Sequence, residues 1–368
     1  NTLSEEMMAK LKSSLTDARD NKSIRVINDK EEQAINFDKC IIATGSRPIN
    51  LPFAEVDHEN ILDSTSALSL KKIPKSMLVI GGGYIGLEMA TAYSSLGTKV
   101  DVVEFLPRLL PGADLDLVEI LEKTLNNKLN KILLNTKVTS ISNIKKTIKV
   151  TMELDRKEFC SSYDKVLICV GRAPNTDNLS LENTGIKTTK DGFIKVDEYR
   201  RTNIDNIFAI GDVTGNPMLA HKATHEGKVA AEVCTNIPSA FDPQVIPAVI
   251  FTDPELAWAG KTEEELKIEN IDYEKAEFPW QASGKAIAMD RTEGKTKILF
   301  EPESKRVIGV GIVGCNASDL IGEAALSIEM GCYSEDIALT IHPHPTLTET
   351  FSNTAEVMEK TITDLYIP

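Results

Sequence analysis

Apolar residues along the middle of the chain recur with the period of a strand or of a helix, and this pattern predicts its elements. Ser76–Ile80 and Lys99–Glu104 are predicted strands, and Tyr84–Leu96 between them is a predicted helix that ends at Gly97. This order predicts a βαβ unit with two parallel strands. The same patterns predict a helix at Asp114–Leu129, antiparallel strands at Thr136–Ser142 and Thr147–Leu154, and an apolar strand at Val166–Val170.

The two ends of the chain carry weaker patterns. Residues 1–20 are predicted to be helical, because Thr2 and Glu5 have capping-box spacing and apolar residues follow on one face. A linker with Pro238, Pro243 and Pro247 marks a domain boundary, beyond which strands and helices alternate as in a separate α+β unit. The remaining predicted strands are Ser23–Asn28, Ala34–Phe37, Lys39–Ala43, Asn206–Ile210, Ala248–Phe251, Lys297–Phe300 and Val307–Val313, and the remaining predicted helices are Met218–Cys234, Ser318–Glu329 and Thr350–Lys360.

Composition narrows the class of protein. The chain has 368 residues, enough for two or three domains, and its net charge of −14 makes nucleic acid an unfavourable partner. No apolar run is long enough to cross a bilayer, and no secretory leader is visible. The six cysteines lack C-x-x-C spacing, so we expect buried, inert thiols in a reducing compartment.

The segment V-I-G-G-G-Y-I-G-L-E, residues 79–88, carries the strongest local motif. Gly81, Gly83 and Gly86 spell G-x-G-x-x-G between a predicted strand and a predicted helix, which is typical of a dinucleotide-binding turn. Glu104 ends the next strand, where a carboxylate accepts hydrogen bonds from a ribose 2′-hydroxyl and repels a 2′-phosphate. The motif therefore favours NAD over NADP, although Arg108, four residues on, weakens that preference.

A second G-x-G-x-x-G is formed by Gly309, Gly311 and Gly314. These glycines lie within a predicted strand rather than after it, and Glu329, about twenty residues on, lies inside a predicted helix. We therefore interpret this match as a strand crowded by neighbouring backbone, not as a nucleotide site.

Two further constellations carry candidate chemistry. Asp212 follows a buried strand, where its carboxylate either holds a polyol hydroxyl of a ligand or caps a helix. In I-H-P-H-P-T-L-T-E, residues 341–349, a turn at Pro345 brings Glu349 back onto His344 and makes a general acid/base pair. His-x-His is also compatible with half of a metal site, and the segment with a structural loop.

The order of five motifs resembles the pyridine-nucleotide disulfide oxidoreductases: C-I-I-A-T-G-S-R-P, G-G-G-Y-I-G-L-E, I-C-V-G-R-A-P-N, I-F-A-I-G-D-V and H-P-H-P-T-L-T-E. Within that family, F-P-W-Q-A-S-G-K-A-I-A and A-L-T-I-H-P-H-P-T-L-T-E are most similar to the dihydrolipoamide dehydrogenases. The resemblance covers the chain from about residue 35 to its end. It implies a Rossmann-like NAD-binding domain inserted in a split FAD-binding domain, followed by a C-terminal α+β dimerisation domain.

The resemblance also implies roles for single residues. Gly81, Gly83, Gly86 and Glu104 would hold NAD, Glu88 would lie near the nicotinamide and the flavin, and Gly171 would lie by the adenine. Asp212 would bind the ribityl chain of FAD, and the backbone of Met218, Leu219 and Ala220 would face the isoalloxazine. His344, oriented by Glu349, would deprotonate dihydrolipoamide. The implied domains are residues 1–74 and 174–242 for FAD, 75–173 for NAD and 243–368 for the interface.

One part of the family pattern has no counterpart in this sequence. The family begins with a flavin G-x-G-x-x-G followed by a C-x-x-x-x-C redox disulfide, and neither occurs here. Since the chain starts with Asn1, we expect an N-terminally incomplete lipoamide dehydrogenase that is inactive by itself. The implied partners are a second copy of the chain and the lipoylated acyltransferase of a 2-oxo-acid dehydrogenase complex, in bacterial cytoplasm or mitochondrial matrix. The alternatives are another disulfide reductase of the family, or a non-catalytic NAD-binding assembly protein.

Overall fold

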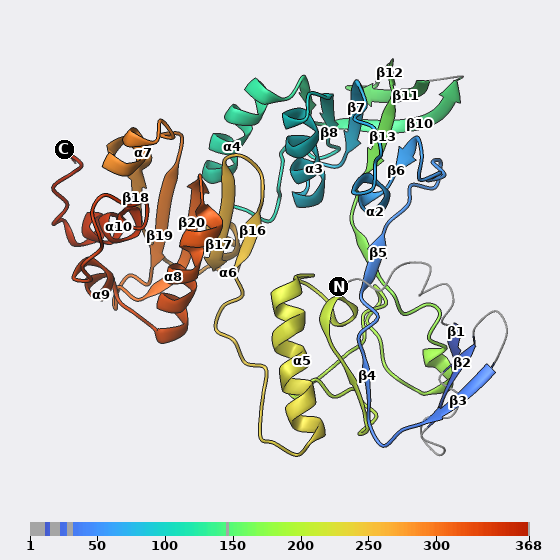
Figure 1. The fold of residues 1–368 in the computed structure, drawn as a ribbon. Helices are drawn as coiled ribbons and strands as arrows, with labels where there is room; N and C mark the ends of the chain where they lie inside the picture. Colours follow the sequence, from blue (N-terminus) through green and yellow to red (C-terminus); the bar gives the residue numbers. More distant parts are fainter. Residues whose placement is uncertain (1–11, 15–22, 28–31, 145–146, 367–368) are drawn as a thin grey trace. The chain divides into compact units, whose positions relative to one another are not determined.

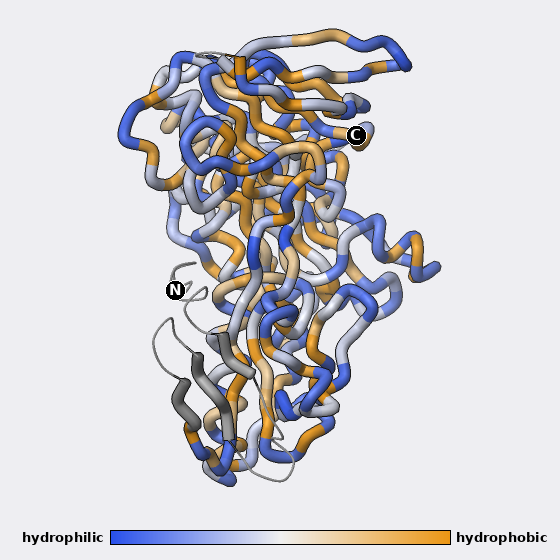
Figure 2. Tube along the Cα trace, turned by 90° about the vertical axis from the view of Figure 1, so that its right-hand side faces the viewer, coloured by the Kyte–Doolittle hydropathy of each residue, from blue (hydrophilic) through white to orange (hydrophobic). Residues whose placement is uncertain are grey.

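The computed structural model describes residues 12–14, 23–27, 32–144 and 147–366. Two compact units make up the chain: unit 1 contains residues 1–49 and 172–242, and unit 2 contains residues 50–171 and 243–368. Each unit is built from segments that are distant in the sequence. Figure 2 shows hydrophobic and hydrophilic stretches alternating along the chain.

A parallel sheet of five strands forms the first half of unit 2, in the order β6-β13-β7-β8-β9. Helix α3 follows β7 directly and packs against β7 and β8, as predicted for a βαβ unit (Figure 1). All four strand pairs are parallel, so the carboxyl ends of the strands share one edge. The elements are β6 (Ile61–Leu62), α2 (Ser64–Ala67), β7 (Ser76–Ile80), α3 (Tyr84–Ser95), β8 (Lys99–Val103), α4 (Leu115–Lys128), β9 (Lys131–Leu133) and β13 (Lys165–Ile168).

An antiparallel sheet of three strands lies between β9 and β13 in the sequence, in the order β10-β11-β12. Its strands are β10 (Thr136–Ile144), β11 (Thr147–Leu154) and β12 (Lys157–Tyr163). The first two confirm the predicted antiparallel pair, whereas the sequence pattern missed β12. Cys160 on β12 is exposed, Cys315 is buried and the other four cysteines are half-buried, so the prediction of buried cysteines is wrong for Cys160 and fully confirmed for Cys315 alone. Alternate side chains of this strand face outward, and Cys160 is one of them.

A second sheet of five strands forms the other half of unit 2, in the order β16-β17-β20-β19-β18, and is antiparallel throughout. Helix α8 packs against β17 and β20, and α10 packs against β18 and β19 (Figure 1). The mixture of strands and helices after the proline-rich linker is confirmed, although residues 243–368 belong to the same compact unit as residues 50–171 and β17 and β18 were not predicted. The elements are β16 (Ala248–Ile250), β17 (Glu255–Gly260), α6 (Glu263–Glu269), β18 (Glu274–Pro279), η3 (Trp280–Ala282), α7 (Gly284–Ala288), β19 (Lys295–Phe300), β20 (Val307–Gly314), α8 (Ala317–Met330), α9 (Ser334–Ala338) and α10 (Glu349–Glu359).

Unit 1 pairs strands from its two sequence segments. β4 is parallel to β15, with Cys40 opposite Ile207, and β5 is antiparallel to β14. The elements are β1 (Lys12–Ser14), β2 (Ser23–Ile27), β3 (Glu32–Asn36), β4 (Cys40–Ile42), β5 (Ser46–Pro48), β14 (Arg172–Pro174), η1 (Leu181–Asn183), β15 (Ile207–Ala209), η2 (Gly211–Thr214) and α5 (Ala220–Cys234).

The predicted N-terminal helix over residues 1–20 is wrong where the structure describes it. Lys12–Ser14 is a strand, β1, which pairs antiparallel with β2. Residues 1–11 and 15–22 of that prediction lie outside the described residues. Helical spacing within a segment does not reveal a partner strand elsewhere, and such pairing overrides local preference.

Candidate functional site

The glycine turn between β7 and α3 has the geometry that its motif predicts. Gly81 has φ +113°, and a Cβ on it would lie 2.2 Å from the carbonyl oxygen of Cys169. A Cβ on Gly86 would lie 2.1 Å from the carbonyl oxygen of Gly81, so only glycine lets the helix start this close to the strand. Gly83, in contrast, has no heavy atom within 4 Å of that position. The turn is therefore tight at both ends and open at Gly83, where a pyrophosphate needs to approach the backbone.

Glu104 lies directly after β8 and is bound to this turn. Its Oε2 accepts the N–H of Gly82 at 2.6 Å, and its Oε1 accepts the N–H of Leu106 at 2.7 Å. These bonds hold the carboxylate beside the glycine turn, at the carboxyl edge of the parallel sheet. That is the position in which an acid meets the ribose of a bound dinucleotide.

Arg108 weakens the predicted preference for NAD over NADP, because a guanidinium near Glu104 would attract a 2′-phosphate. In the structure this guanidinium binds other residues of the chain. Its guanidinium forms an ion pair with Glu264 of α6 and donates to the carbonyl oxygen of Ala113. Weaker contacts of 3.4 Å reach the carbonyl oxygens of Leu109 and Leu110. One acid and several carbonyl oxygens of the chain bind this guanidinium. The positive charge of Arg108 is therefore not free to bind a 2′-phosphate beside Glu104.

Gly309, Gly311 and Gly314 lie inside β20, and neighbouring atoms crowd all three of them. A Cβ would lie 2.0 Å from the carbonyl oxygen of Lys261 at Gly309, 2.3 Å from Leu117 at Gly311 and 2.3 Å from the ring of Trp280 at Gly314. The interpretation of this second motif as close packing is confirmed, and side chains crowd it as much as backbone does.

Glu88 and Gly171 are the other residues of unit 2 that the resemblance assigns to cofactors. Glu88, on α3, is half-buried, and its Oε1 accepts the N–H of Phe251 at 3.0 Å. Burial raises the pKa of the Glu88 carboxyl, and this hydrogen bond only partly opposes the shift. No ion pair of the described residues involves Glu88. Gly171 is exposed, with φ +123°, shortly after β13.

In unit 1, Asp212 lies in the short η2 turn immediately after β15. Its Oδ2 accepts the hydroxyl of Ser46 at 2.5 Å, and the Ser46 hydroxyl oxygen in turn accepts Nε of Arg172 at 2.7 Å. The carboxylate thus lies at the carboxyl end of the parallel pair β4–β15, where ligands of parallel sheets bind. Ligand binding by Asp212 at this edge stays a prediction.

The backbone of Met218, Leu219 and Ala220 leads into α5, with Leu219 as its N-cap and Ala220 as its first residue. Amide groups in the first turn of a helix lack acceptors within the helix and are available to a ligand or a cap. The N–H of Leu219 already donates to the carbonyl oxygen of Pro217 at 3.1 Å, so the backbone donors that this part of unit 1 offers lie in the first turn of α5.

His344 and Glu349 are joined by a direct hydrogen bond, as the sequence predicted. Nδ1 of His344 lies 2.8 Å from Oε1 of Glu349, and Oε2 of the same carboxylate accepts the N–H of Thr346 at 2.6 Å. The imidazole is 75% exposed, and no hydrogen bond within the described residues occupies its Nε2. A carboxylate that holds Nδ1–H leaves Nε2 as a base open to the outside.

Two family models match this chain. Residues 1–227 match the pyridine nucleotide-disulphide oxidoreductases, and residues 246–355 match the dimerisation domain of the same family. The chain belongs to the pyridine nucleotide-disulphide oxidoreductase family. The assignment by motif order and the predicted fold class are therefore confirmed, and the dimerisation domain supports a homodimer.

Curated members of the pyridine nucleotide-disulphide oxidoreductase family are similar over most of the chain. The dihydrolipoyl dehydrogenase of Vibrio cholerae is 52% identical over 93% of this chain and 72% of its own length. That of Haemophilus influenzae is 50% identical over 92% and 70%. Among solved structures, the Cu(II) complex of the HOCl-induced flavoprotein disulfide reductase RclA of Escherichia coli has a TM-score of 0.84 at 26% identity, over 94% of this chain and 77% of that one.

In this oxidoreductase, two clusters of charged residues were not predicted from the sequence. The first lies beneath η2, where the buried carboxylate of Glu226 accepts the N–H of Gly211 at 2.6 Å and Nη1 of Arg200 at 2.9 Å. Nζ of Lys222 lies 3.1 Å from the same carboxylate. This network fixes the turn that carries Asp212. Its signal in the sequence is the i, i+4 spacing of Lys222 and Glu226 on one helix.

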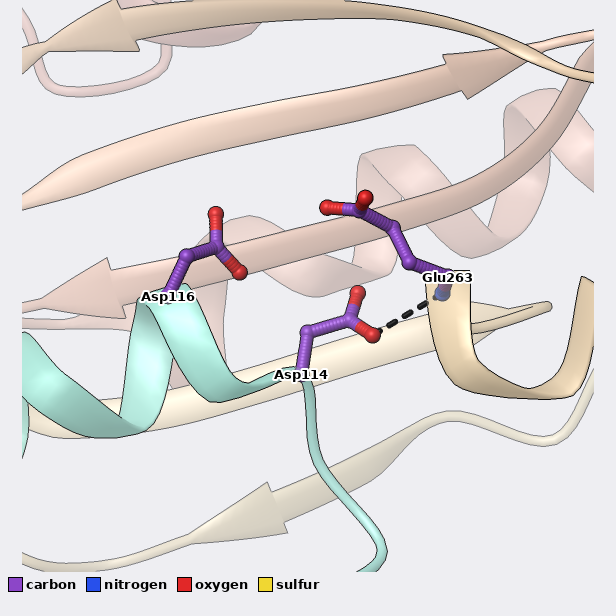
Figure 3. Close-up of side chains that lie close together, drawn as sticks. All are labelled: Asp114, Asp116 and Glu263. Carbon is purple, nitrogen blue, oxygen red and sulfur yellow. Dashed lines mark hydrogen bonds between the residues drawn. The ribbon is translucent and has the colours of Figure 1, made fainter. Parts of the chain in front are cut away.

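The second cluster joins α4, α6 and β19 within unit 2. Asp114, Asp116 and Glu263 turn their carboxylates toward one point (Figure 3), an arrangement that is geometrically compatible with a metal ion. The ammonium of buried Lys297 lies 2.7 Å from Asp114, 2.7 Å from Asp116 and 2.9 Å from Glu263. The lysine therefore supplies the cation that these acids bind.

Among the described helices, none combines the length and apolar character needed to span a membrane.

Proposed function

We propose that this chain is part of a dihydrolipoyl dehydrogenase, an enzyme that oxidises the dithiol of dihydrolipoamide to a disulfide and reduces NAD to NADH. The observation that carries the proposal is the His344–Glu349 pair, with Nδ1 bound and Nε2 exposed. It occurs in a chain about half identical to relatives with that name, which supports the substrate class.

In the proposed reaction, Nε2 of His344 takes the proton of a dihydrolipoamide thiol, which makes the sulfur a nucleophile. Glu349 keeps the hydrogen of the ring on Nδ1 and stabilises the imidazolium that forms. The two groups thus divide the work: His344 moves the proton, and Glu349 orients and stabilises the ring. Since Glu349 is also bound to Thr346 N–H, its carboxylate does not have to reorganise when the charge develops.

FAD, when bound, supplies the chemistry that passes an electron pair from a dithiol to a nicotinamide. The residues proposed to hold it are Asp212, through a ribityl hydroxyl, and the backbone of Met218, Leu219 and Ala220. Asp212 fits this role because it lies at the ligand-binding edge of the β4–β15 pair and is already oriented by Ser46.

NAD is proposed to bind along the carboxyl edge of the parallel sheet in unit 2. The open space at Gly83 admits the pyrophosphate, while Gly81 and Gly86 let the turn fold, and Glu104 accepts the hydroxyls of the adenosine ribose. Glu88 would lie near the nicotinamide and Gly171 near the adenine. We further propose residues 75–173 as the NAD domain, residues 1–74 and 174–242 as FAD domain, and residues 243–368 as interface domain.

The proposed partners are a second copy of the chain and the lipoylated acyltransferase of a 2-oxo-acid dehydrogenase complex. The match to a dimerisation domain supports the first, and the names of the relatives support the second. Bacterial relatives support the bacterial cytoplasm as its compartment rather than a mitochondrial matrix.

The test is steady-state turnover of the full-length, FAD-loaded enzyme with two pairs of substrates. We expect dihydrolipoamide to reduce NAD, with little reduction of NADP. The same enzyme is then given NADPH with glutathione disulfide, which a glutathione-type reductase of the family would consume. Turnover of that second pair alone would replace the proposal, and NADH binding without turnover of either pair would favour a non-catalytic assembly protein.

A further inference from the structure

The segment that carries His344 is held on both sides by one carboxylate of a neighbouring helix. Oε1 of Glu323, on α8, lies 2.7 Å from Nε2 of His342, and its Oε2 accepts the hydroxyl of Thr348 at 3.3 Å. His342 lies two residues before His344, and Thr348 lies directly before Glu349. Glu323 therefore spans the same short segment that Glu349 binds from within.

His342 has both of its ring nitrogens in hydrogen bonds, unlike His344. Its Nδ1 lies 2.8 Å from the carbonyl oxygen of Thr340, and its Nε2 faces the carboxylate of Glu323. A carbonyl oxygen and a carboxylate are both acceptors, so each ring nitrogen has to carry a hydrogen for both bonds to form. Both bonds form together only when both ring nitrogens carry hydrogen, and neither nitrogen is then left to act as a base.

The groups that hold His342 are themselves fixed to the core of unit 2. Thr340 lies just after α9, where its hydroxyl donates to the carbonyl oxygen of Asp336 at 2.7 Å. Glu323 lies between Ile321 and Ala324, which are buried in the same hydrophobic cluster as Leu347. The hydrogen-bond partners of His342 are thus fixed by the end of α9, by helix α8 and by the hydrophobic core.

Burial separates the two histidines as clearly as hydrogen bonding does. The side chain of His342 is 7% exposed, against 75% for that of His344. The imidazole of this pair is sheltered from water, the Glu323 side chain is 37% exposed, and charge-assisted hydrogen bonds are shorter and stronger than neutral ones. The ion pair is thus suited to fix the backbone, whereas the exposed imidazole is suited to meet a substrate.

We propose that His342 and Glu323 are positioning residues for His344: their ion pair sets the path of residues 342–348 and so the place from which Nε2 of His344 meets the dithiol. The proposal rests on the proposed dihydrolipoyl dehydrogenase activity. A displacement of about 1 Å at a reacting group lowers rates up to roughly a hundredfold, so the loss of this pair affects the dithiol step without removing the base.

The first experiment compares His342→Gln and Glu323→Gln with Glu335→Gln, a matched control on the exposed face of α9. In the full-length, FAD-loaded enzyme, kcat with dihydrolipoamide should fall roughly 10- to 100-fold in the first two variants and stay unchanged in the control. NADH oxidation by ferricyanide, which does not need the dithiol step, should remain normal in all three. The double variant should lose no more than the worse single variant, because both changes break one interaction.

A fall in both reactions, or additive losses in the double variant, would overturn the positioning role. The second measurement needs no variant of the pair: in protein labelled with 15N at its five histidines, both ring nitrogens of His342 should show hydrogen bonds, whereas Nε2 of His344 should show none. A bare ring nitrogen at His342 would overturn the ion pair itself. The His344→Ala enzyme separates the two proposals, because normal dihydrolipoamide turnover in that variant rejects the proposed function and leaves the geometry of His342 to the NMR result.

Discussion

One carboxylate, that of Glu349, binds both the Nδ1 atom of His344 at 2.8 Å and the backbone N–H of Thr346 at 2.6 Å. The ring and the turn that presents it are therefore fixed by the same side chain. Loss of the imidazole and loss of its carboxylate should have different consequences, because only the imidazole exchanges a proton with substrate.

The first prediction follows from this difference. In the full-length enzyme, His344→Ala should lower kcat with dihydrolipoamide about 10²- to 10⁴-fold, the contribution typical of a positioned general base. Glu349→Ala should cost less, because Nε2 of the ring remains. Steady-state rates with dihydrolipoamide and NAD measure both. Near-normal turnover of the His344→Ala enzyme would remove this residue from the mechanism.

The second prediction compares two glycines that belong to two identical motifs. Gly83→Ala should leave the melting temperature nearly unchanged, since its Cβ meets open space, but should weaken NADH binding at least about tenfold by filling the pyrophosphate position. Gly309→Ala should destabilise the protein by at least about 1–3 kcal/mol, because its Cβ would lie 2.0 Å from a carbonyl oxygen. Calorimetry and NADH titration measure the pair. Equal melting temperatures would contradict the packing argument.

The third prediction concerns the choice of nucleotide. Glu104→Ala should weaken NADH binding about 10- to 100-fold, the value of hydrogen bonds to a charged acceptor, and should narrow the gap between NADH and NADPH. Arg108→Ala is the matched control and should not change that gap, because its guanidinium is held by Glu264 and Ala113. Titration with both nucleotides is the measurement. Preference for NADPH in the unaltered protein would show that the ribose argument is wrong.

The fourth prediction concerns Lys297 and its three acids. Burial by itself would raise the pKa of Glu263, but the hydrogen bond and charge of Lys297 outweigh it and lower that pKa to about 2. The stabilisation is thus complete above pH about 4, where unfolded Glu is ionised, and is lost as the pH falls toward 2. Lys297→Met should cost about 3 kcal/mol at pH 7, because buried carboxylates lose their cation.

The pH dependence of the stability of the Lys297→Met variant tests the direction of this effect. Without the ammonium, mutual repulsion raises the pKa of the acids, so the deficit of Lys297→Met should shrink as the pH is lowered from 7 to 4. Urea unfolding at several pH values measures it. Added Ca²⁺ should not raise the melting temperature of the unaltered protein, in which Lys297 holds the acids. A rise would favour the metal site over the ion cluster.

Periodicity and motif order predicted the elements whose partners are near in sequence. α3 and β8 were located because a helix follows a glycine turn and a capping pattern ends it at Gly97. β17 and β18 were missed: β17 carries glycine and alanine in A-W-A-G, and β18 alternates charged residues with Ala276 and Phe278. Their strand conformation comes from the ladder with β19 and β20, which a local pattern does not contain.

The contacts of the candidate site also fall into two groups, those that the sequence predicted and those that it did not. The bond between His344 and Glu349 was predictable, because a turn at Pro345 brings two residues five apart into contact. The contact of Lys297 with Asp114 and Asp116 was not predictable. These residues are distant in sequence, and a lysine in a strand pattern is expected to be exposed to solvent. Likewise Ser46 gave no sign that it orients Asp212, since only the pairing of β5 with β14 and of β4 with β15 brings the two together.

The pairing of β4 with β15 has a consequence for how the protein is made. Cys40 finds its partner Ile207 only after the whole parallel sheet of the other unit has left the ribosome. During synthesis, residues 61–168 can therefore form their sheet first, and β4 has no partner strand until β15 is made. Such long-range closure is slow, and an unpaired edge is a place where chains associate wrongly. Chaperone demand during translation should accordingly fall on unit 1, and a ribosome stalled before residue 207 should display β4 to protease while β7 is protected.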